Sequence, residues 1–220
     1  MRVLIIGASG GIGAALSREA ETRGATVTGL SRSKDGLDVT DEASVETHLA
    51  GLDGTYEAIW VATGALEIGD HGPEKALRDL SPDAFAAQFA LNATGPALVL
   101  KHAARLLPRR GRATFAAMSA RVGSIGDNRA GGWYAYRASK AALNQLLHTA
   151  AIELARTHRD LICAALHPGT VATPFTEKYL GRHPAVAPEE AARNLWSVLD
   201  GLTPADTGGF FDWAGKRVAW

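Results

Sequence analysis

"RVLIIGASGGIG", residues 2 to 13, joins an apolar run to a glycine-rich turn and the start of a helical pattern. The apolar run is typical of a buried strand, and residues 11–23 have the spacing of a helix. Gly7, Gly11 and Gly13 lie around the turn. Glycine lets backbone N–H groups approach a phosphate, at which the positive N-terminus of the helix also points. The stretch therefore predicts a strand–turn–helix unit for a dinucleotide pyrophosphate, with a ligand-free glycine turn as the alternative.

Short apolar runs alternate with longer helical patterns along the rest of the chain. We expect further strands at residues 25–31, 36–39, 57–63, 112–119, 161–168 and 208–213, and helices at 41–50, 82–107, 133–158 and 188–200. Repeated strand–helix–strand units imply a parallel sheet with helices on both faces. The prediction is an α/β fold: a three-layer, doubly wound (Rossmann-type), mostly parallel sheet in a single domain over residues 1–220. Ligands of such sheets bind at the carboxyl ends of the strands.

Composition narrows the partners that this chain can have. Of its 220 residues 46% are hydrophobic, and 23 Lys and Arg balance 23 Asp and Glu, which argues against nucleic acid or an acidic membrane. The single cysteine, Cys163, forms no internal disulfide and suits a reducing compartment. The first apolar run is shorter than a signal peptide, and no run approaches the ~20 residues of a membrane span. We therefore predict a cytoplasmic protein. The seven histidines form no metal-ligand motif, so we predict no metal site.

The second strand ends in "GLSRS", which places Ser31 and Arg32 where an NAD-type site usually carries an acidic residue. A guanidinium there would pair with a 2′-phosphate. The pattern favours NADP(H), with NAD(H) as the alternative cofactor and an ordinary surface arginine as the alternative interpretation.

"YAYRASK", residues 134 to 140, sets Tyr136 four residues before Lys140. Four residues make about one helical turn, so both side chains project from one face. A nearby ammonium stabilises phenolate and lowers the pKa of a tyrosine, which predicts an acid–base pair. A half-buried helix tyrosine is the alternative. Trp133 and Tyr134 lack a lysine at that offset and are expected in packing or in a pocket wall.

These motifs, in this order, resemble the short-chain dehydrogenase/reductase family over nearly the whole chain. The glycine loop is followed by "DVTD", "ATGA", "NATG", "MSAR", the Y-x-x-x-K pair and "HPGTVATP". A narrower resemblance links "RVGSIGDN", "GGWYAYRASKAALN" and "GGFFDWAGKRVAW" to small carbonyl-reductase-like members of the sniffer and C-factor type. Two departures stand out: "ATGA" replaces an Asn-Asn-Ala-Gly motif, and residues 174–187 are short for a substrate lid.

The resemblance implies an enzyme that moves a hydride between NADP and a small or medium aldehyde, ketone or secondary alcohol. It implies Tyr136 as general acid/base, Lys140 also on the nicotinamide ribose, Ser119 as donor to the substrate oxygen, and Asn92 as holder of a relay water. Ser124 is a rival to Ser119. The residues implied for the cofactor are Gly7, Ser9, Gly10, Gly11, Ile12, Gly13, Ser31, Arg32, Asp38, Val39, Ala62, Thr63, Gly64, Asn92, Tyr136, Lys140, Pro168, Gly169, Val171 and Thr173.

Other functions and assemblies compete with this interpretation. An NADP-binding sensor or cell-signalling protein of C-factor type would use the same fold with secondary or no catalysis. A nucleotide-sugar epimerase would need a larger C-terminal region, and a methyltransferase would not need Y-x-x-x-K. Helices at 82–107 and 133–158 resemble family dimer faces, which predicts a homodimer or homotetramer, with a monomer as the alternative.

Overall fold

A computed structural model describes residues 1–174, 176, 178 and 184–220. Its six strands form one parallel sheet in the order β2-β1-β3-β4-β5-β6. The strands are β1 Arg2–Ile6, β2 Thr26–Leu30, β3 Ala58–Val61, β4 Ala113–Met118, β5 Leu161–His167 and β6 Phe210–Asp212. The chain moves from β1 to β2 on one side and returns to β3 on the other, so the strand order reverses at β1. The predicted doubly wound fold is confirmed.

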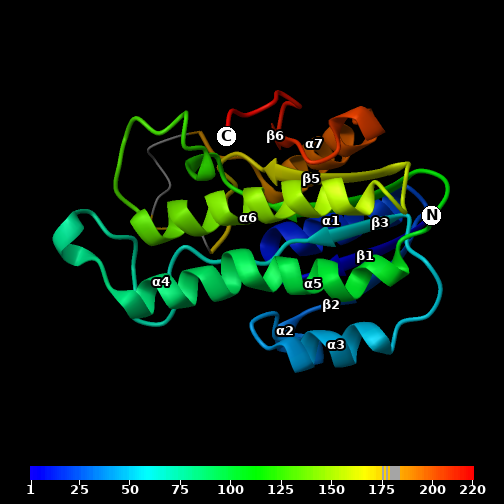
Figure 1. The fold of residues 1–220 in the computed structure, drawn as a ribbon, viewed down its shortest axis with the longest axis horizontal. Coiled ribbons are helices and arrows are strands. Elements are labelled where there is room, and N and C mark those ends of the chain that lie inside the picture. Colours follow the sequence, from blue (N-terminus) through cyan, green and yellow to red (C-terminus); the bar gives the residue numbers. More distant parts are fainter. Residues whose placement is uncertain (175, 177, 179–183) are drawn as a thin grey trace.

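Helices cover both faces of this sheet (Figure 1). They are α1 Gly11–Thr22, α2 Arg32–Asp35, α3 Glu42–Ala50, α4 Pro82–Phe89, α5 Gly95–Ala103, α6 Tyr134–Leu154 and α7 Pro188–Gly201. In the view of Figure 1, α4, α5 and α6 lie in front of the sheet, with α1 and α7 behind it. Each face has its own apolar core, and consecutive β4 residues alternate between them: Phe115 and Ala117 face α6, whereas Ala116 and Met118 face α1 and α7.

Residues 36–39 form no strand, so that expectation is wrong. Ser31 accepts a hydrogen bond from the Lys34 N–H and begins the one-turn helix α2, which Gly36 ends in a left-handed conformation at φ 80°. The chain then turns, because the Asp38 carboxylate accepts hydrogen bonds from the N–H and hydroxyl of Thr40. This local capping outcompetes the pairing that a strand would need.

The expected helix over 82–107 is one helical run that changes its winding near the middle. Between α4 and α5 lies a π-helical turn, Ala90–Thr94, and a short 3₁₀ turn, Ala104–Leu106, ends the run. Pro96 has no N–H, so the α-helical bond to the carbonyl of Asn92 cannot form. The π turn passes this point, and such turns are frequent at functional sites.

Two further expectations concern the lid and membranes. Half of the lid segment, residues 175, 177 and 179–183, lies outside the described residues. In the part of the chain that the structure describes, no helix has the length and apolarity needed to cross a membrane.

Candidate active site

The glycine loop leaves no room for side chains. Gly7 has φ 89°, and a Cβ there would lie 2.9 Å from the carbonyl carbon of Ala62. A Cβ on Gly13 would lie 2.1 Å from the Gly7 carbonyl oxygen. No side chain caps α1 at Gly10, and the first turn of α1 carries no acidic residue. This cradle of close backbone and uncapped helix N-terminus fits a dinucleotide pyrophosphate.

The segment after β2 carries two exposed cations, Arg32 and Lys34. Ser31 is buried, and both its N–H and its hydroxyl already donate to the Asp35 carboxylate, at 2.7 and 3.1 Å. Arg32 is exposed and makes no hydrogen bond or ion pair with any described residue. The Ser33 hydroxyl donates to the Ser9 hydroxyl at 2.9 Å and ties this loop to the glycine loop. A 2′-phosphate would therefore meet Arg32 more readily than Ser31.

Asp38 and Val39 border the next strand end. Hydrogen bonds from the Thr40 hydroxyl and N–H lower the pKa of Asp38. Val39 is buried, and a Cβ on Gly95 would lie 2.9 Å from its Cγ2, so the start of α5 packs tightly here. The two residues, which the resemblance implies for the cofactor, are thus held by their own surroundings.

Tyr136 and Lys140 project from one face of α6, as their spacing predicts. Both are buried, at 7% and 2% exposure, and the Lys140 Nζ lies 5.9 Å from the Tyr136 ring centroid. The Lys140 ammonium donates to the Met118 carbonyl at 2.8 Å. Burial lowers the pKa of Lys140 to about 7 and raises the pKa of Tyr136. The expected lowering of the tyrosine pKa is therefore wrong for the protein alone, because burial also removes much of the lysine charge near neutral pH.

Asn92 sits in the π-helical turn and holds the loop after β3. Its Oδ1 accepts from the Ala65 N–H at 3.0 Å, and its Nδ2 donates to the Ala65 carbonyl at 2.9 Å and to Gln88 Oε1 at 2.6 Å. A Cβ on Gly64 would lie 2.8 Å from Asn92 Oδ1 and 3.3 Å from Lys140 Nζ. The structure thus brings Asn92 and Lys140 to the same glycine. Gln88 was not predicted, although its i−4 spacing to Asn92 was a usable signal.

Thr63 adds an unsatisfied polar atom to this edge. Its hydroxyl is buried and has no hydrogen-bond partner among the described residues. A buried polar group without a partner is costly unless a ligand or water completes it. This orphaned hydroxyl, beside the glycine cradle and next to Ala62 and Gly64, fits a polar cofactor.

The Ser119 hydroxyl donates to a side chain of α6. Residue 119 continues the alternation of β4 toward α6, where its hydroxyl is buried and donates to Asn144 Oδ1 at 2.6 Å. Asn144 is eight residues beyond Tyr136, about 12 Å along the helix. The hydroxyl is thus engaged by Asn144, and its expected contact with a substrate oxygen stays a prediction. The rival, Ser124, is also buried and accepts from the Asp127 N–H at 3.1 Å.

Asn144 was missed by the sequence analysis, although it falls on the same helical face as Tyr136 and Lys140. Its Nδ2 is buried and has no hydrogen-bond partner among the described residues. Two positions on α6, Lys140 and Asn144, therefore bind consecutive residues at the end of β4.

The Pro-Gly loop follows β5 at the carboxyl edge of the sheet. It contains Pro168, Gly169, Val171 and Thr173. A Cβ on Gly11 would lie 2.7 Å from the Thr173 methyl, so this loop touches the glycine loop. Gly169 has φ 78°, and a Cβ there would lie 3.0 Å from the ring of Trp213, an exposed residue that was not predicted. Ile12 and Ala62 pack at the border of the core under α1 and α7.

The glycine loop, Arg32, Thr63 and the Pro-Gly loop follow the carboxyl ends of β1, β2, β3 and β5, and Tyr136 and Lys140 lie in the first two turns of α6. A glycine cradle, an exposed arginine after β2 and a buried tyrosine–lysine pair thus lie at the carboxyl edge of the sheet, where doubly wound folds bind their ligands.

Comparison with known proteins identifies the family. A model described as short chain dehydrogenase matches residues 1–182. A 1-hydroxy-2-glutathionyl-2-methyl-3-butene dehydrogenase of Rhodococcus sp. (strain AD45) is 32% identical over 99% of both chains. The C-signal protein of Myxococcus xanthus is 35% identical over 73% of this chain and 96% of its own. The chain therefore belongs to the short-chain dehydrogenase/reductase family.

Solved structures agree with this assignment. A short-chain dehydrogenase/reductase of Burkholderia multivorans with bound NADP superposes with a TM-score of 0.81 at 26% identity, covering 100% of this chain and 99% of the other. Carbonyl reductase Sniffer of D. melanogaster superposes with a TM-score of 0.80 over 100% and 99% of the two chains. At 20% identity, Sniffer shows the shared fold alone. The resemblance to small carbonyl-reductase-like members is confirmed.

Proposed function

We propose that this protein is an NADP(H)-dependent oxidoreductase that transfers a hydride between nicotinamide and a carbonyl or alcohol substrate. The observation that carries the proposal is the buried pair Tyr136 and Lys140, one helical turn apart at the sheet edge that also holds the glycine cradle. NADP bound to the Burkholderia relative supports the choice of cofactor. Small or medium aldehydes, ketones and secondary alcohols are the proposed substrates.

Tyr136 supplies the proton for carbonyl reduction. Bound NADPH supplies the hydride, and the carbonyl oxygen takes up one proton as the alcohol forms. Burial raises the pKa of Tyr136, so the phenol carries its proton at neutral pH, and a positive charge beside it would be needed to make it a stronger acid. Lys140 lies beside the ring, and its amine would hold the ribose next to nicotinamide. Asn92 and Lys140 both lie beside Gly64. Asn92 therefore belongs to the proposed route by which the Lys140 amine exchanges protons with water.

A turnover assay with paired tyrosine variants tests this role. NADPH and NADH oxidation would be followed with a panel of aldehydes, ketones and quinones. The reverse reaction would be assayed with 1-hydroxy-2-glutathionyl-2-methyl-3-butene, the alcohol in the name of the Rhodococcus relative. We expect Tyr136→Phe to lower kcat about 10²- to 10⁴-fold without weakening NADPH binding. Tyr134→Phe is the matched control, because Tyr134 is half-buried two residues earlier on α6, and it should keep its activity. Equal rates for Tyr136→Phe and wild type would place the chemistry elsewhere.

A sensor or signalling role is the second candidate, favoured by the identity to C-signal. Tight NADPH binding by wild type without turnover on the panel would favour it. The intact Tyr136 and Lys140 argue for catalysis, because a module that only binds the cofactor needs no proton-transfer pair.

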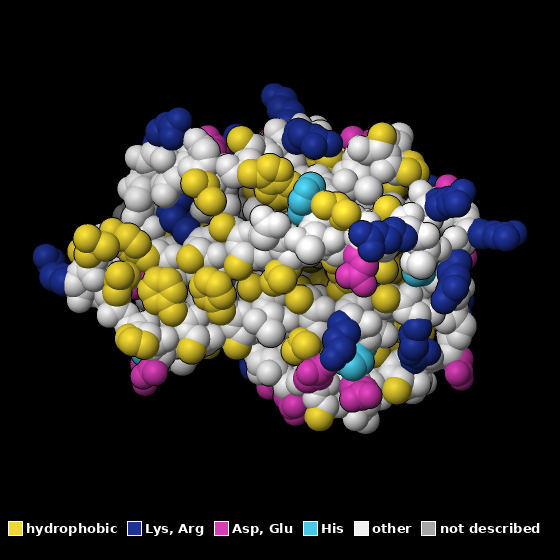
Figure 2. Space-filling view, viewed as in Figure 1, with side chains coloured by type: hydrophobic (Ala, Val, Ile, Leu, Met, Phe, Trp, Pro, Cys, Tyr) yellow, Lys and Arg dark blue, Asp and Glu magenta, His cyan; other side chains and the backbone are white. Residues whose placement is uncertain are grey.

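We also propose a homodimer or homotetramer built on α4, α5 and α6. Figure 2 shows hydrophobic side chains gathered over α4 and the neighbouring part of α6 on this face, with charged side chains toward the other end. Leu146 and Ile152 of α6 are exposed. Light scattering at several concentrations measures this assembly, and a monomer at all of them would refute it. Cytoplasmic location stays a prediction.

A further inference from the structure

The catalytic helix begins in an unusual way. Gly131, Gly132 and Trp133 all have positive φ angles, of 64°, 65° and 56°, and Trp133 is the one such non-glycine residue in the described chain. Left-handed backbone at a bulky residue persists only where surrounding contacts enforce it. Trp133 also occupies the N-cap position of α6, where an indole offers no acceptor to the first N–H groups. Contacts from other residues must therefore hold this left-handed turn, which ends three residues before Tyr136.

Glu74 provides the missing contacts from the loop between β3 and α4. Its backbone carbonyl accepts from the Trp133 N–H at 2.6 Å, and its carboxylate Oε2 accepts from the Ala135 N–H at 3.2 Å. The side chain is buried at 6% exposure. It pairs with no Lys, Arg or His of the described residues, and its Oε1 has no hydrogen-bond partner there. The carboxylate is thus buried against the helix N-terminus itself, whose partial positive charge favours an anion.

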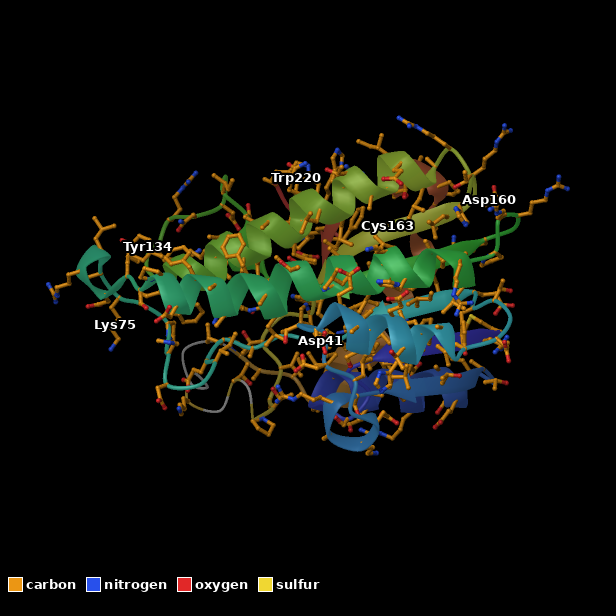
Figure 3. The ribbon with its side chains drawn as sticks, turned by 60° about the horizontal axis from the view of Figure 1, so that its bottom comes forward. Asp41, Lys75, Tyr134, Asp160, Cys163 and Trp220 are labelled. Carbon is orange, nitrogen blue, oxygen red and sulfur yellow. The ribbon has the colours of Figure 1, made fainter. Side chains whose placement is uncertain are left out.

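A second clamp acts from the opposite side of the same turn. The Arg137 guanidinium donates to the carbonyls of Gly132 at 2.9 Å and Gly131 at 3.1 Å. The left-handed turn is therefore held between Arg137, within α6, and Glu74, about 60 residues earlier. Figure 3 shows Lys75, the neighbour of Glu74, and Tyr134 at the same end of the molecule. The Glu74 contacts join the β3–α4 loop to the N-terminus of α6, three residues before Tyr136.

We propose that Glu74 is a positioning residue, which locks the β3–α4 loop onto the N-terminus of α6 and so holds Tyr136 in place for proton transfer. This inference rests on the proposed function for its catalytic consequence, but the lock itself is a property of the fold.

Hydrogen exchange and kinetics test the lock together. In Glu74→Ala, amide exchange in the peptide covering residues 133–137 should accelerate at least about fivefold, as loss of a helix cap predicts. kcat should fall about tenfold or more, with NADPH affinity changed less than twofold. Glu74→Gln should restore most of both, because its amide oxygen still accepts from the Ala135 N–H. Asp41→Ala is the matched control: its carboxylate caps α3 through the Ala43 N–H at 3.0 Å, far from the site, and its loss should change neither readout.

Each outcome decides the proposal. Unchanged exchange at 133–137 in Glu74→Ala would overturn the lock, as would the same exchange in Asp41→Ala. Faster exchange with an unchanged kcat in an active enzyme would overturn the positioning role. If wild type reduces nothing on the panel, faster exchange in Glu74→Ala still supports the lock, and the failure belongs to the proposed function.

Discussion

Replacing Ser119 with alanine separates two roles for its hydroxyl, because each role affects a different measurement. In the structure the buried Ser119 hydroxyl donates a hydrogen bond to Asn144 Oδ1 at 2.6 Å. Alanine leaves that oxygen without its donor, beside an Nδ2 that has no partner among the described residues. A buried acceptor left unsatisfied costs about 1–3 kcal/mol. In a chain of 220 residues each kcal/mol lowers Tm by about 2–4 °C.

The effect on catalysis should be small. A hydroxyl that donates to the developing oxyanion is worth about 10²–10³ in kcat. One that fixes α6 against β4 acts on Tyr136 only through the helix, so we expect kcat to fall less than about tenfold. Urea unfolding gives the free energy, and NADPH oxidation at saturating substrate gives kcat. Asn144→Ala and the double variant complete a cycle, in which the second substitution should cost little stability after the first.

The reverse pattern would refute the reasoning. A loss of about 100-fold in kcat with an unchanged free energy of unfolding would mean that Ser119 turns toward the reacting oxygen during turnover. Independent stability losses for Ser119→Ala and Asn144→Ala would mean that their hydrogen bond contributes little.

Three further predictions concern the cofactor and the buried lysine. In Gly13→Ala the new Cβ would lie 2.1 Å from the Gly7 carbonyl oxygen, so the backbone must move by about 1 Å. We expect the free energy of unfolding to fall by about 1–3 kcal/mol and calorimetry to detect no NADPH binding. Gly51→Ala is the control, because Gly51 follows α3 with φ −73° and a Cβ there would lie 3.7 Å from its nearest neighbour. Arg32→Ala should weaken NADPH binding about 10- to 100-fold and leave NADH unchanged, and an equal loss for both cofactors would remove Arg32 from the 2′-phosphate site. Because folding lowers the pKa of Lys140 to about 7 from 10.5, the unfolded chain binds the extra proton between those values. The free energy of unfolding should therefore rise with pH across that window in wild type relative to Lys140→Met, and parallel pH curves would show that Lys140 is not so perturbed.

Periodicity predicted the elements that bury a continuous apolar surface. Strands β1, β3 and β5 read as apolar runs because both of their faces are covered, and the long helices keep their spacing. The region after β2 was misread, because residues 36–39 carry a strand-like pair of apolar residues while capping by Ser31 and Gly36 decides the backbone. Short-range capping outweighs pattern where an element is only one turn long.

The candidate site was predictable only where spacing carries the information. Tyr136 and Lys140 share a helical face by their offset, and Asn144 could have been added on the same ground. Glu74 gave no such signal, because the helix that it caps begins about 60 residues later and the N-cap position itself holds a tryptophan. The direction of Ser119 was also hidden, since it depends on which core the end of β4 faces.

Three contacts at the end of β4 fix the position of α6, and therefore of Tyr136. The Met118 carbonyl accepts from the Lys140 ammonium, and the Ser119 hydroxyl donates to Asn144. The turn that follows touches the helix backbone, because a Cβ on Gly123 would lie 2.8 Å from the Lys140 Cβ. Lys140 is thus tied to the sheet through its ammonium before any cofactor arrives, while burial keeps the proton on Tyr136. A site set in this way holds Tyr136 in its protonated form, and a positive charge from Lys140 would have to offset the raised pKa before that proton passes to a substrate oxygen.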